Sequence, residues 1–102
     1  MRVVKPSTIR RFADEFPDAA NALEGWLKVT RAADWQNIQD VRRQIPNADG
    51  VVVESGNTVT VFNIRGGHYR LIVSIKYQWR MVYVLRFLTH REYDKDQWKE
   101  QL

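Results

Sequence analysis

The chain has 102 residues and a net charge of +4, with no cysteine and two histidines. A chain of this length is predicted to form a single domain, residues 1–102, that buries roughly two thirds of its unfolded surface and folds without disulfides. The composition excludes a disulfide framework and a thiolate zinc site, and two histidines make a poor metal site, so we expect no metal and no cofactor.

The sequence opens MRVVKPSTIRRF, which lacks the continuous apolar run of a signal peptide. No window approaches the roughly 18 apolar residues that a membrane span requires. We therefore expect a soluble, cytoplasmic protein that has no membrane partner.

The first half of the chain is predicted to be mostly helical. Residues 1–4 favour a short strand that ends before Pro6. Pro6 and Pro17 each suit the first turn of a helix. The apolar residues after each proline recur at helical spacing: Ile9, Phe12, Ala13 and Phe16, then Ala19, Ala22, Leu23, Trp26, Leu27 and Thr30. The two helices would form a hairpin able to cover a sheet, and a third short helix, with Trp35, Ile38 and Val41 or Arg42 on one side, ends before Pro46.

From Val51 the apolar period changes to two. The runs 51–54, 58–65, 68–77 and 80–88 are typical of strands, and they are separated by SGN, GG and QW. The pattern turns helical again from His90 to about Trp98. Helices, then an antiparallel meander, then a terminal helix predict an α+β two-layer fold, with N-terminal helices on a mostly antiparallel four-stranded sheet.

The excess positive charge belongs to one segment of the chain. No carboxylate lies between Glu54 and Glu92, whereas six basic residues do: Arg65, Arg70, Lys76, Arg80, Arg86 and Arg91. A positive face without acids attracts polyanions, and nucleic-acid phosphate is the commonest of them. Arginines on strands also serve as solubilising charge and as edge gatekeepers, so this pattern alone leaves both interpretations open.

Two turns fix the predicted register of the sheet. Gly66-Gly67 is a strong two-residue hairpin signal, because glycine supplies positive φ without strain. It pairs Asn63 with Arg70 and Phe62 with Leu71. A three-residue connection, 78–80, then pairs Ile75 with Tyr83 and Leu71 with Phe87. The apolar face receives the tyrosines and most apolar residues, and the other face receives the polar ones: Arg65, His68, Arg70, Ser74, Lys76 and Arg86.

The segment FLTHREYDK, 87–95, ends the last strand and begins the terminal helix. Thr89 and Glu92 form a capping box. His90 and Tyr93 then lie in the first helical turn, which presents free N–H groups and the positive end of the helix dipole. We expect a cluster at this corner of the sheet: Arg65, His68, Arg70, Arg86, His90 and Tyr93. Lys76 lies apart, about 20 Å along its strand from Arg70.

Plainer explanations exist for the same residues. Tyr93 suits a hydrophobic staple against Leu88, and His68 and His90 suit exposed positions beside a turn and at a strand end. If the bound anion is an RNA phosphodiester, however, the cluster suits cleavage by the adjacent 2′-hydroxyl. Histidine serves as base or acid near neutral pH, and arginine offsets charge on the phosphorane. Tyr93 would donate a hydrogen bond, transfer a proton or stack on a base, and the residues do not choose among these roles.

The segments FNIRGGHYRLIVSIKY and VYVLRFLTHREYDK, together with the helical hairpin before them, resemble the HigB toxin family of type II toxin-antitoxin systems, within the RelE-like superfamily. The resemblance covers most of the chain and is densest from Phe62 to Lys95. It implies a RelE-like fold and a metal-independent endoribonuclease that cuts mRNA on the translating ribosome. It also implies neutralisation by a HigA-type helix-turn-helix antitoxin, with operator DNA bound only through that antitoxin.

By position, the resemblance implies catalytic roles for Arg70, His90 and Tyr93. Expected to bind RNA phosphate are the remaining basic residues of the region: Arg65, His68, Arg86, Arg91 and Lys76. The chain departs from the pattern on the strand before YRLI, where several RelE-like toxins carry lysines and this chain has Asn63 and Val61. A histidine that follows the tyrosine in some HigB-type toxins is also absent.

Two other functions share these features. ParE-like relatives with the same fold poison DNA gyrase and cut no RNA, and fold alone does not separate the two activities. The basic and aromatic cluster favours the nuclease, because inhibition through a protein interface needs no proton-transfer group. A non-catalytic RNA-binding module would stack bases on exposed aromatic residues. The predicted placement of Tyr69, Tyr77 and Tyr83 on the core face argues against it.

Overall fold

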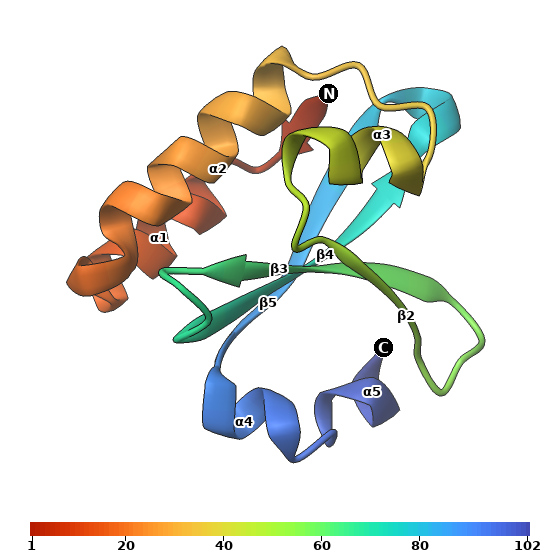
Figure 1. Ribbon diagram of the computed structural model, residues 1–102. Coiled ribbons are helices and arrows are strands. Elements are labelled where there is room, and N and C mark those ends of the chain that lie inside the picture. The colour runs from red at the N-terminus through yellow and green to blue at the C-terminus, as the bar shows by residue number, and fades with distance from the viewer.

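The computed structural model describes all residues 1–102, and it places helices on both faces of a five-stranded sheet (Figure 1). The strand order is β1-β5-β4-β3-β2, in which β2 to β5 form the predicted antiparallel meander and β1 adds a fifth strand parallel to β5. In chain order the elements are β1 (Arg2–Val4), α1 (Ser7–Glu15), the 3-10 turn η1 (Pro17–Ala19), α2 (Ala20–Ala32), α3 (Ile38–Gln44), β2 (Asp49–Val52), β3 (Thr58–Ile64), β4 (Tyr69–Lys76), the 3-10 turn η2 (Tyr77–Trp79), β5 (Met81–Thr89), α4 (His90–Asp94) and α5 (Trp98–Gln101). The α+β fold expected from the sequence is confirmed.

One face of the sheet, here called the inner face, packs against the hairpin of α1 and α2 and against α3 (Figure 1). Its core is a cluster of 17 buried residues to which all three helices contribute. Phe62 lies at the centre: its ring packs edge-on against Trp26, with centroids 5.6 Å apart, and stacks on Trp35 at 6.4 Å. The apolar stripes that recur at helical spacing therefore face the sheet and form the core, as predicted.

The opposite, outer face carries a second and smaller apolar cluster. Its five buried residues are Val53, Val59, Val61, Ile72 and Trp98. The cluster lies under α4 and α5, which occupy the opposite side of the sheet from α1 and α2 (Figure 1). The predicted terminal helix is broken into these two pieces, because Asp96 adopts a left-handed φ of 61°. The break lets Trp98 turn back onto the sheet, so this face is partly apolar rather than wholly polar.

The first hairpin register is confirmed and the second is partly wrong. Ile64 pairs with Tyr69 and Asn63 with Arg70, as the glycine turn predicts. In the second hairpin the connection is one residue longer than expected, and it ends at Arg80, whose φ is 55°. Ile75 therefore pairs with Val82 rather than with Tyr83.

A β-bulge corrects that shift farther along the strand. Val73 pairs with Val84 and Ile72 with Arg86, so Leu85 has no partner, and beyond it Leu71 meets Phe87 as predicted. Before the bulge, however, Tyr83 pairs with Ser74 on the outer face and is 37% exposed. The prediction that Tyr83 faces the core is wrong, because the sequence pattern does not reveal a bulge.

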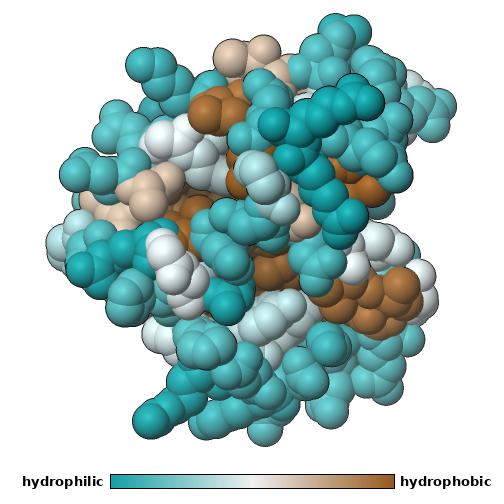
Figure 2. All heavy atoms as spheres, in the orientation of Figure 1, coloured by the Kyte–Doolittle hydropathy of each residue, from teal (hydrophilic) through white to brown (hydrophobic).

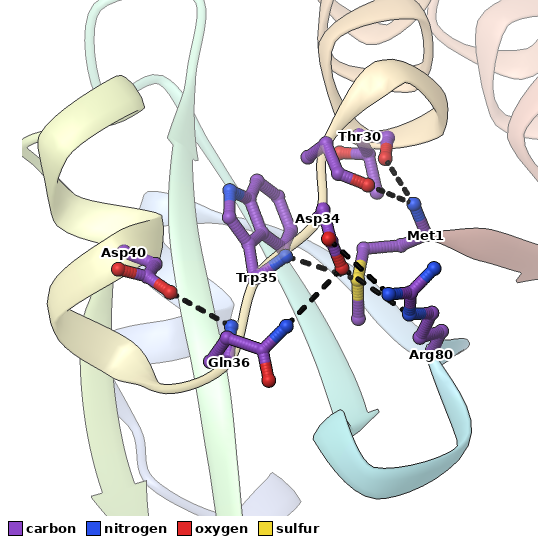
Figure 3. Close-up of polar contacts among 8 residues, drawn as sticks. Met1, Thr30, Asp34, Trp35, Gln36, Asp40 and Arg80 are labelled. Carbon is purple, nitrogen blue, oxygen red and sulfur yellow. Dashed lines mark hydrogen bonds and ion pairs between the residues drawn. The ribbon is translucent and has the colours of Figure 1, made fainter.

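The first residue ties several elements together (Figure 3). The Met1 ammonium donates to the carbonyls of Thr30, at 3.1 Å, and of Ala33, and so caps the end of α2. The backbone N–H of Trp35 in turn donates to the Met1 sulfur at 3.3 Å. These contacts fix the segment that leads from α2 into α3.

The surface is mostly hydrophilic in Figure 2, with an apolar area over β2, where Val52 is 66% exposed. β2 forms one edge of the sheet. None of the helices combines the length and the apolar character that a membrane crossing requires.

Candidate active site

Arg70, the second residue of β4, lies at the centre of the candidate site. Its guanidinium folds back over the glycine turn, and Nη1 donates to the Gly67 carbonyl at 2.6 Å and to the Tyr69 carbonyl at 3.3 Å. Gly67 has a φ of 90°, and a Cβ there would lie 3.4 Å from Nη1. The glycine turn thus sets the strand register and also supplies the carbonyl that holds the guanidinium.

His90 begins α4 directly after β5 and lies beside this guanidinium. Its backbone N–H donates to the His68 carbonyl at 3.0 Å, which ties the start of α4 to the glycine turn. The ring Nδ1 is 3.5 Å from Arg70 Nη2, the outer limit of a hydrogen bond, and Nε2 is 3.4 Å from the Asp94 carboxylate. A carboxylate near Nε2 and a guanidinium near Nδ1 favour a proton on Nε2. The Nδ1 lone pair then faces Arg70.

The predicted capping box holds the first turn of α4. The Glu92 N–H donates to Thr89 Oγ1 at 3.2 Å, and the Thr89 N–H donates to the Glu92 carboxylate at 2.9 Å. A cap of this kind contributes about 1 kcal/mol. Because α4 is far shorter than an isolated helix that is stable in water, the cap and the packing below it define where His90 and Tyr93 lie.

Tyr93 joins the small outer cluster to Arg70. Its ring stacks on Trp98, with centroids 5.2 Å apart, and the Arg70 guanidinium carbon lies 5.4 Å from the ring centroid. Burial, and then the Asp49 carboxylate, raise the pKa of Tyr93 and outweigh Lys99 and Arg70, which lower it. The phenol therefore stays protonated at neutral pH and can donate a hydrogen bond. Leu88 and Tyr93 both pack against the buried residues of the outer cluster, which agrees with the staple interpretation as well.

A polar cleft of about 580 Å³ opens beside Arg70 and Tyr93. Besides these two, its polar lining comes from α3, the loop after it, β2 and β3: Arg42, Asn47, Asp49 and Asn63. Sequence reasoning placed Asn63 opposite Arg70 but assigned no role to any of the four. Helical spacing leaves Val41 or Arg42 open as the core-facing residue of α3; Val41 is fully buried, and Arg42 lines the cleft instead.

Arg65 does not join the cluster, and its expected place there is wrong. It pairs with Asp18 of η1, with Nη1 to Oδ2 at 3.2 Å, and the Tyr69 hydroxyl donates to the same carboxylate at 2.9 Å. The left-handed φ of 53° at Arg65 removes the residue from the alternation of β3. Its side chain therefore reaches the helical layer instead of the outer face.

The other predicted residues lie on or near the outer face without touching Arg70. Arg86 pairs with Ile72 and donates to the Leu85 carbonyl at 2.7 Å, so the expected contact with Arg70 is not formed. His68 contributes its carbonyl, and its side chain is exposed. Lys76 is exposed at the far end of β4, and Arg91 is exposed on α4.

Residues 55–91 include no acidic residue, but acidic side chains from the first half of the chain pair with two of their arginines. Arg65 and Arg80 are paired with Asp18 and Asp34, which come from the first half of the chain. Four bases of the segment form no ion pair: Arg70, Lys76, Arg86 and Arg91. No group of three or more histidine and carboxylate side chains lies together in a way that could hold a metal ion.

Comparisons with known proteins identify the family of the chain. Residues 19–96 match the sequence pattern of the HigB toxin family, described as the RelE-like toxic component of a toxin-antitoxin system. Over 95 residues the chain is 25% identical to a protein of Escherichia coli O6:H1 named mRNA interferase HigB, which covers 93% of this chain and 90% of that protein. The family match spans most of the chain, so this protein belongs to the HigB family of RelE-like toxins, whose members act in partnership with an antitoxin.

Proposed function

We propose that this chain is an endoribonuclease that cuts mRNA, the activity named for its Escherichia coli relative. The observation that carries the proposal is the contact between a guanidinium and an imidazole at an open cleft: Arg70 Nη2 lies 3.5 Å from His90 Nδ1. A protonated phenol, Tyr93, completes the group. These side chains match the three needs of phosphodiester cleavage, namely charge stabilisation, proton removal and proton donation.

In the proposed reaction the guanidinium of Arg70 binds the non-bridging oxygens of the scissile phosphate. His90 Nδ1 takes the proton of the adjacent 2′-hydroxyl, which attacks phosphorus and forms a 2′,3′-cyclic phosphate. The bond to the 5′ oxygen breaks, and Tyr93 supplies the proton that this oxygen needs. Because the nucleophile belongs to the substrate and Arg70 offsets the charge, the reaction proceeds without a metal ion. Solvent exchange then returns His90 and Tyr93 to their starting protonation states.

We further propose that the substrate is mRNA on the translating ribosome, that the protein acts in the cytoplasm, and that its antitoxin is of the helix-turn-helix HigA type. The family supports an antitoxin partner, and the resemblance of the last strand and α4 to HigB sequences supports the finer assignment. Operator DNA would then be contacted through the antitoxin.

The test is to induce the chain in cells and to map the 5′ ends of transcripts. We expect cuts within reading frames, and we expect the downstream fragments to carry 5′-hydroxyl ends. These cuts should vanish when translation is blocked. Intact messages together with double-strand DNA breaks would instead support a ParE-like gyrase inhibitor.

A non-catalytic RNA-binding module is a second candidate, because Tyr83 lies on the outer face and is exposed, as is Trp79 in η2. Base stacking on exposed aromatic rings binds RNA without cutting it. In the same experiment, such a module would associate with messages and leave them whole.

A further inference from the structure

Arg42, near the end of α3, presents a guanidinium held ready at one wall of the cleft. Its Nε donates to the Ala48 carbonyl at 2.9 Å, and Nη2 lies 3.4 Å from Asp49 Oδ1. Its side chain is 49% exposed. A guanidinium has five N–H donors, and these contacts orient the group without using most of them. The remaining donors are free to bind an anion.

Stability of α3 gives little reason for this arrangement. The ion pair of Arg42 with Asp49 is exposed and long, and pairs of this kind contribute about 0–1 kcal/mol. The helix is held through the buried side chain of Val41 and through its Asn37 cap. The neighbouring Arg43 makes an ordinary pair within the helix, with Asp40 at 3.0 Å.

The cleft has basic groups on two walls, Arg42 from α3 and Arg70 from β4, with the amides of Asn47 and Asn63 also in its lining. Its volume of about 580 Å³ falls in the range of sites that hold whole small molecules, roughly 300–1,000 Å³. It therefore has room for a nucleotide rather than for a phosphate group alone. A single RNA strand that crosses such a cleft brings successive phosphates to both guanidiniums.

Asp49 competes with a phosphate for Arg42. Its carboxylate is 64% exposed, contacts Arg42, and acts electrostatically on Tyr93, so it faces the same cleft as Arg70 and Tyr93. Bound RNA would place an anion where the carboxylate now serves as the partner of Arg42. Phosphate oxygens match a guanidinium fork at least as well as one carboxylate oxygen at 3.4 Å.

We propose that Arg42 is a second RNA-binding residue. When RNA binds, the Arg42 guanidinium gives up its contact with Asp49 and binds the phosphate next to the one that Arg70 binds. The inference rests on RNA being the substrate, as proposed above. Arg42 does not take part in proton transfer, so it is a positioning residue and acts through binding.

The experiment measures binding of the folded protein to a fluorescent single-stranded RNA whose 2′-hydroxyls are all methylated and which therefore cannot be cleaved. Arg42→Ala is compared with Arg43→Ala, which removes the same charge one position along the same helix. We expect Arg42→Ala to weaken binding on the order of 10-fold, as loss of a charged hydrogen-bonding group does. We also expect it to reduce the slope of log K against log salt by about 0.7, the value for one phosphate of a single strand.

Three further variants complete the test. Arg43→Ala should change affinity and salt slope much less than Arg42→Ala. Asp49→Asn should tighten binding, because it frees Arg42 and removes an opposing charge. Arg42→Lys should keep the salt slope but recover only part of the affinity, since lysine retains the charge and lacks the fork.

Equal effects of Arg42→Ala and Arg43→Ala, or no effect of either while Arg70→Ala weakens binding, would overturn the assignment of Arg42 and leave the proposed nuclease standing. A wild-type protein that does not bind this free RNA would likewise overturn the assignment of Arg42, whereas the proposed cleavage on the ribosome stands or falls by the 5′ ends of transcripts mapped in cells. Circular dichroism and thermal unfolding check that each variant is folded.

Discussion

The two faces of the sheet differ in how many residues they help to bury and in whether a cleft lies beside them. The cluster formed by the inner face with α1, α2 and α3 holds 17 buried residues, whereas the cluster formed by the outer face with α5 holds five and has a polar cleft beside it. Arg70 and Leu71 are neighbours on β4, yet Leu71 is fully buried inside and Arg70 lines the cleft. Because successive side chains of a strand point to opposite faces of the sheet, a core residue and a residue of the candidate site can be neighbours in the chain.

On the outer face the separation is less complete. Tyr93 belongs to the small apolar cluster, where it stacks on Trp98, and also lines the cleft with Arg70. The apolar cluster and the candidate site therefore share a side chain there. Substitutions on the inner face should change stability alone, and substitutions around Trp98 should change both.

The sharpest test of the contrast between the two faces replaces each of two adjacent residues by alanine in turn. Arg70→Ala should abolish most RNA cleavage, by about 10³-fold, because it removes a preorganised donor to the phosphate, and should leave stability nearly unchanged. Leu71→Ala should cost about 2–5 kcal/mol in stability through a core cavity and keep activity per folded molecule. Urea unfolding and cleavage rates on the same preparations measure both quantities. Similar losses of both in the two variants would show that the faces are not independent.

The next largest effects are expected at the proton-transfer candidates. His90→Ala and Tyr93→Phe should each lower turnover by about 10²–10⁴-fold, the usual contribution of general acid-base catalysis. Both proteins should stay folded and still bind the antitoxin, because the side chains removed are exposed or replaced by the same ring. Growth inhibition and co-purification with the antitoxin measure the two properties. Full toxicity of both variants would remove these residues from the site.

Trp98 tests whether packing and chemistry are shared on the outer face. Trp98→Ala should destabilise the protein by about 3 kcal/mol or more, as loss of a large buried aromatic does, and should also lower cleavage because Tyr93 loses its stacking partner. Trp98→Phe keeps an aromatic ring and should restore most of both. Cleavage by Trp98→Ala at the wild-type rate, measured where the protein is fully folded, would show that Tyr93 is positioned independently.

Two glycines with nearly the same φ offer a matched comparison. Gly67, with a φ of 90°, lies beside the Arg70 guanidinium, whereas Gly56, with a φ of 91°, has open space around it. Alanine at either position should cost roughly 1–2 kcal/mol through strain. Gly67→Ala should also lower cleavage several-fold, because strain at this residue shifts the carbonyl that accepts from Arg70 Nη1, and Gly56→Ala should not. Equal cleavage by the two variants would mean that the turn does not position Arg70.

The smallest effect concerns pH. Burial and Asp49 raise the pKa of Tyr93 above the ordinary tyrosine value of 10.0, so the folded protein favours the protonated phenol. That contribution to stability is fully present below the unfolded pKa, about 10, and is lost as the pH rises through the raised value. Ionisation of Tyr93 should therefore not limit cleavage below that pH. Asp49→Asn should lower the pKa of Tyr93, measured from the ultraviolet absorbance of tyrosinate as the pH rises. Tyr93→Phe should remove one titrating group from the same curve.

Local signals in the sequence predict much of this molecule. The glycine pair gives the register of β3 and β4, and Thr89 with Glu92 gives the cap of α4, because each depends on residues close together in the chain. Together they place Arg70, His90 and Tyr93 at one corner. The roles of these residues remain predictions, whereas their proximity is observed.

Features that depend on tertiary context escape the same reasoning. The bulge at Leu85 moves Tyr83 to the exposed face, and the left-handed backbone at Arg65 sends that side chain to Asp18. The cleft walls formed by Arg42 and Asp49 come from segments whose spacing in the sequence gives no sign that they approach β4. A run of bases likewise says nothing about acids that distant segments bring to it.

The place of β5 in the sheet has a consequence for the order of assembly. β5 lies between β1 and β4, and it pairs with residues near the beginning of the chain as well as with its hairpin neighbour. Contacts this far apart in sequence carry a large loop-closure cost and form slowly. His90 follows β5 directly, so we expect a freshly synthesised molecule to remain harmless until β5 is inserted between β1 and β4.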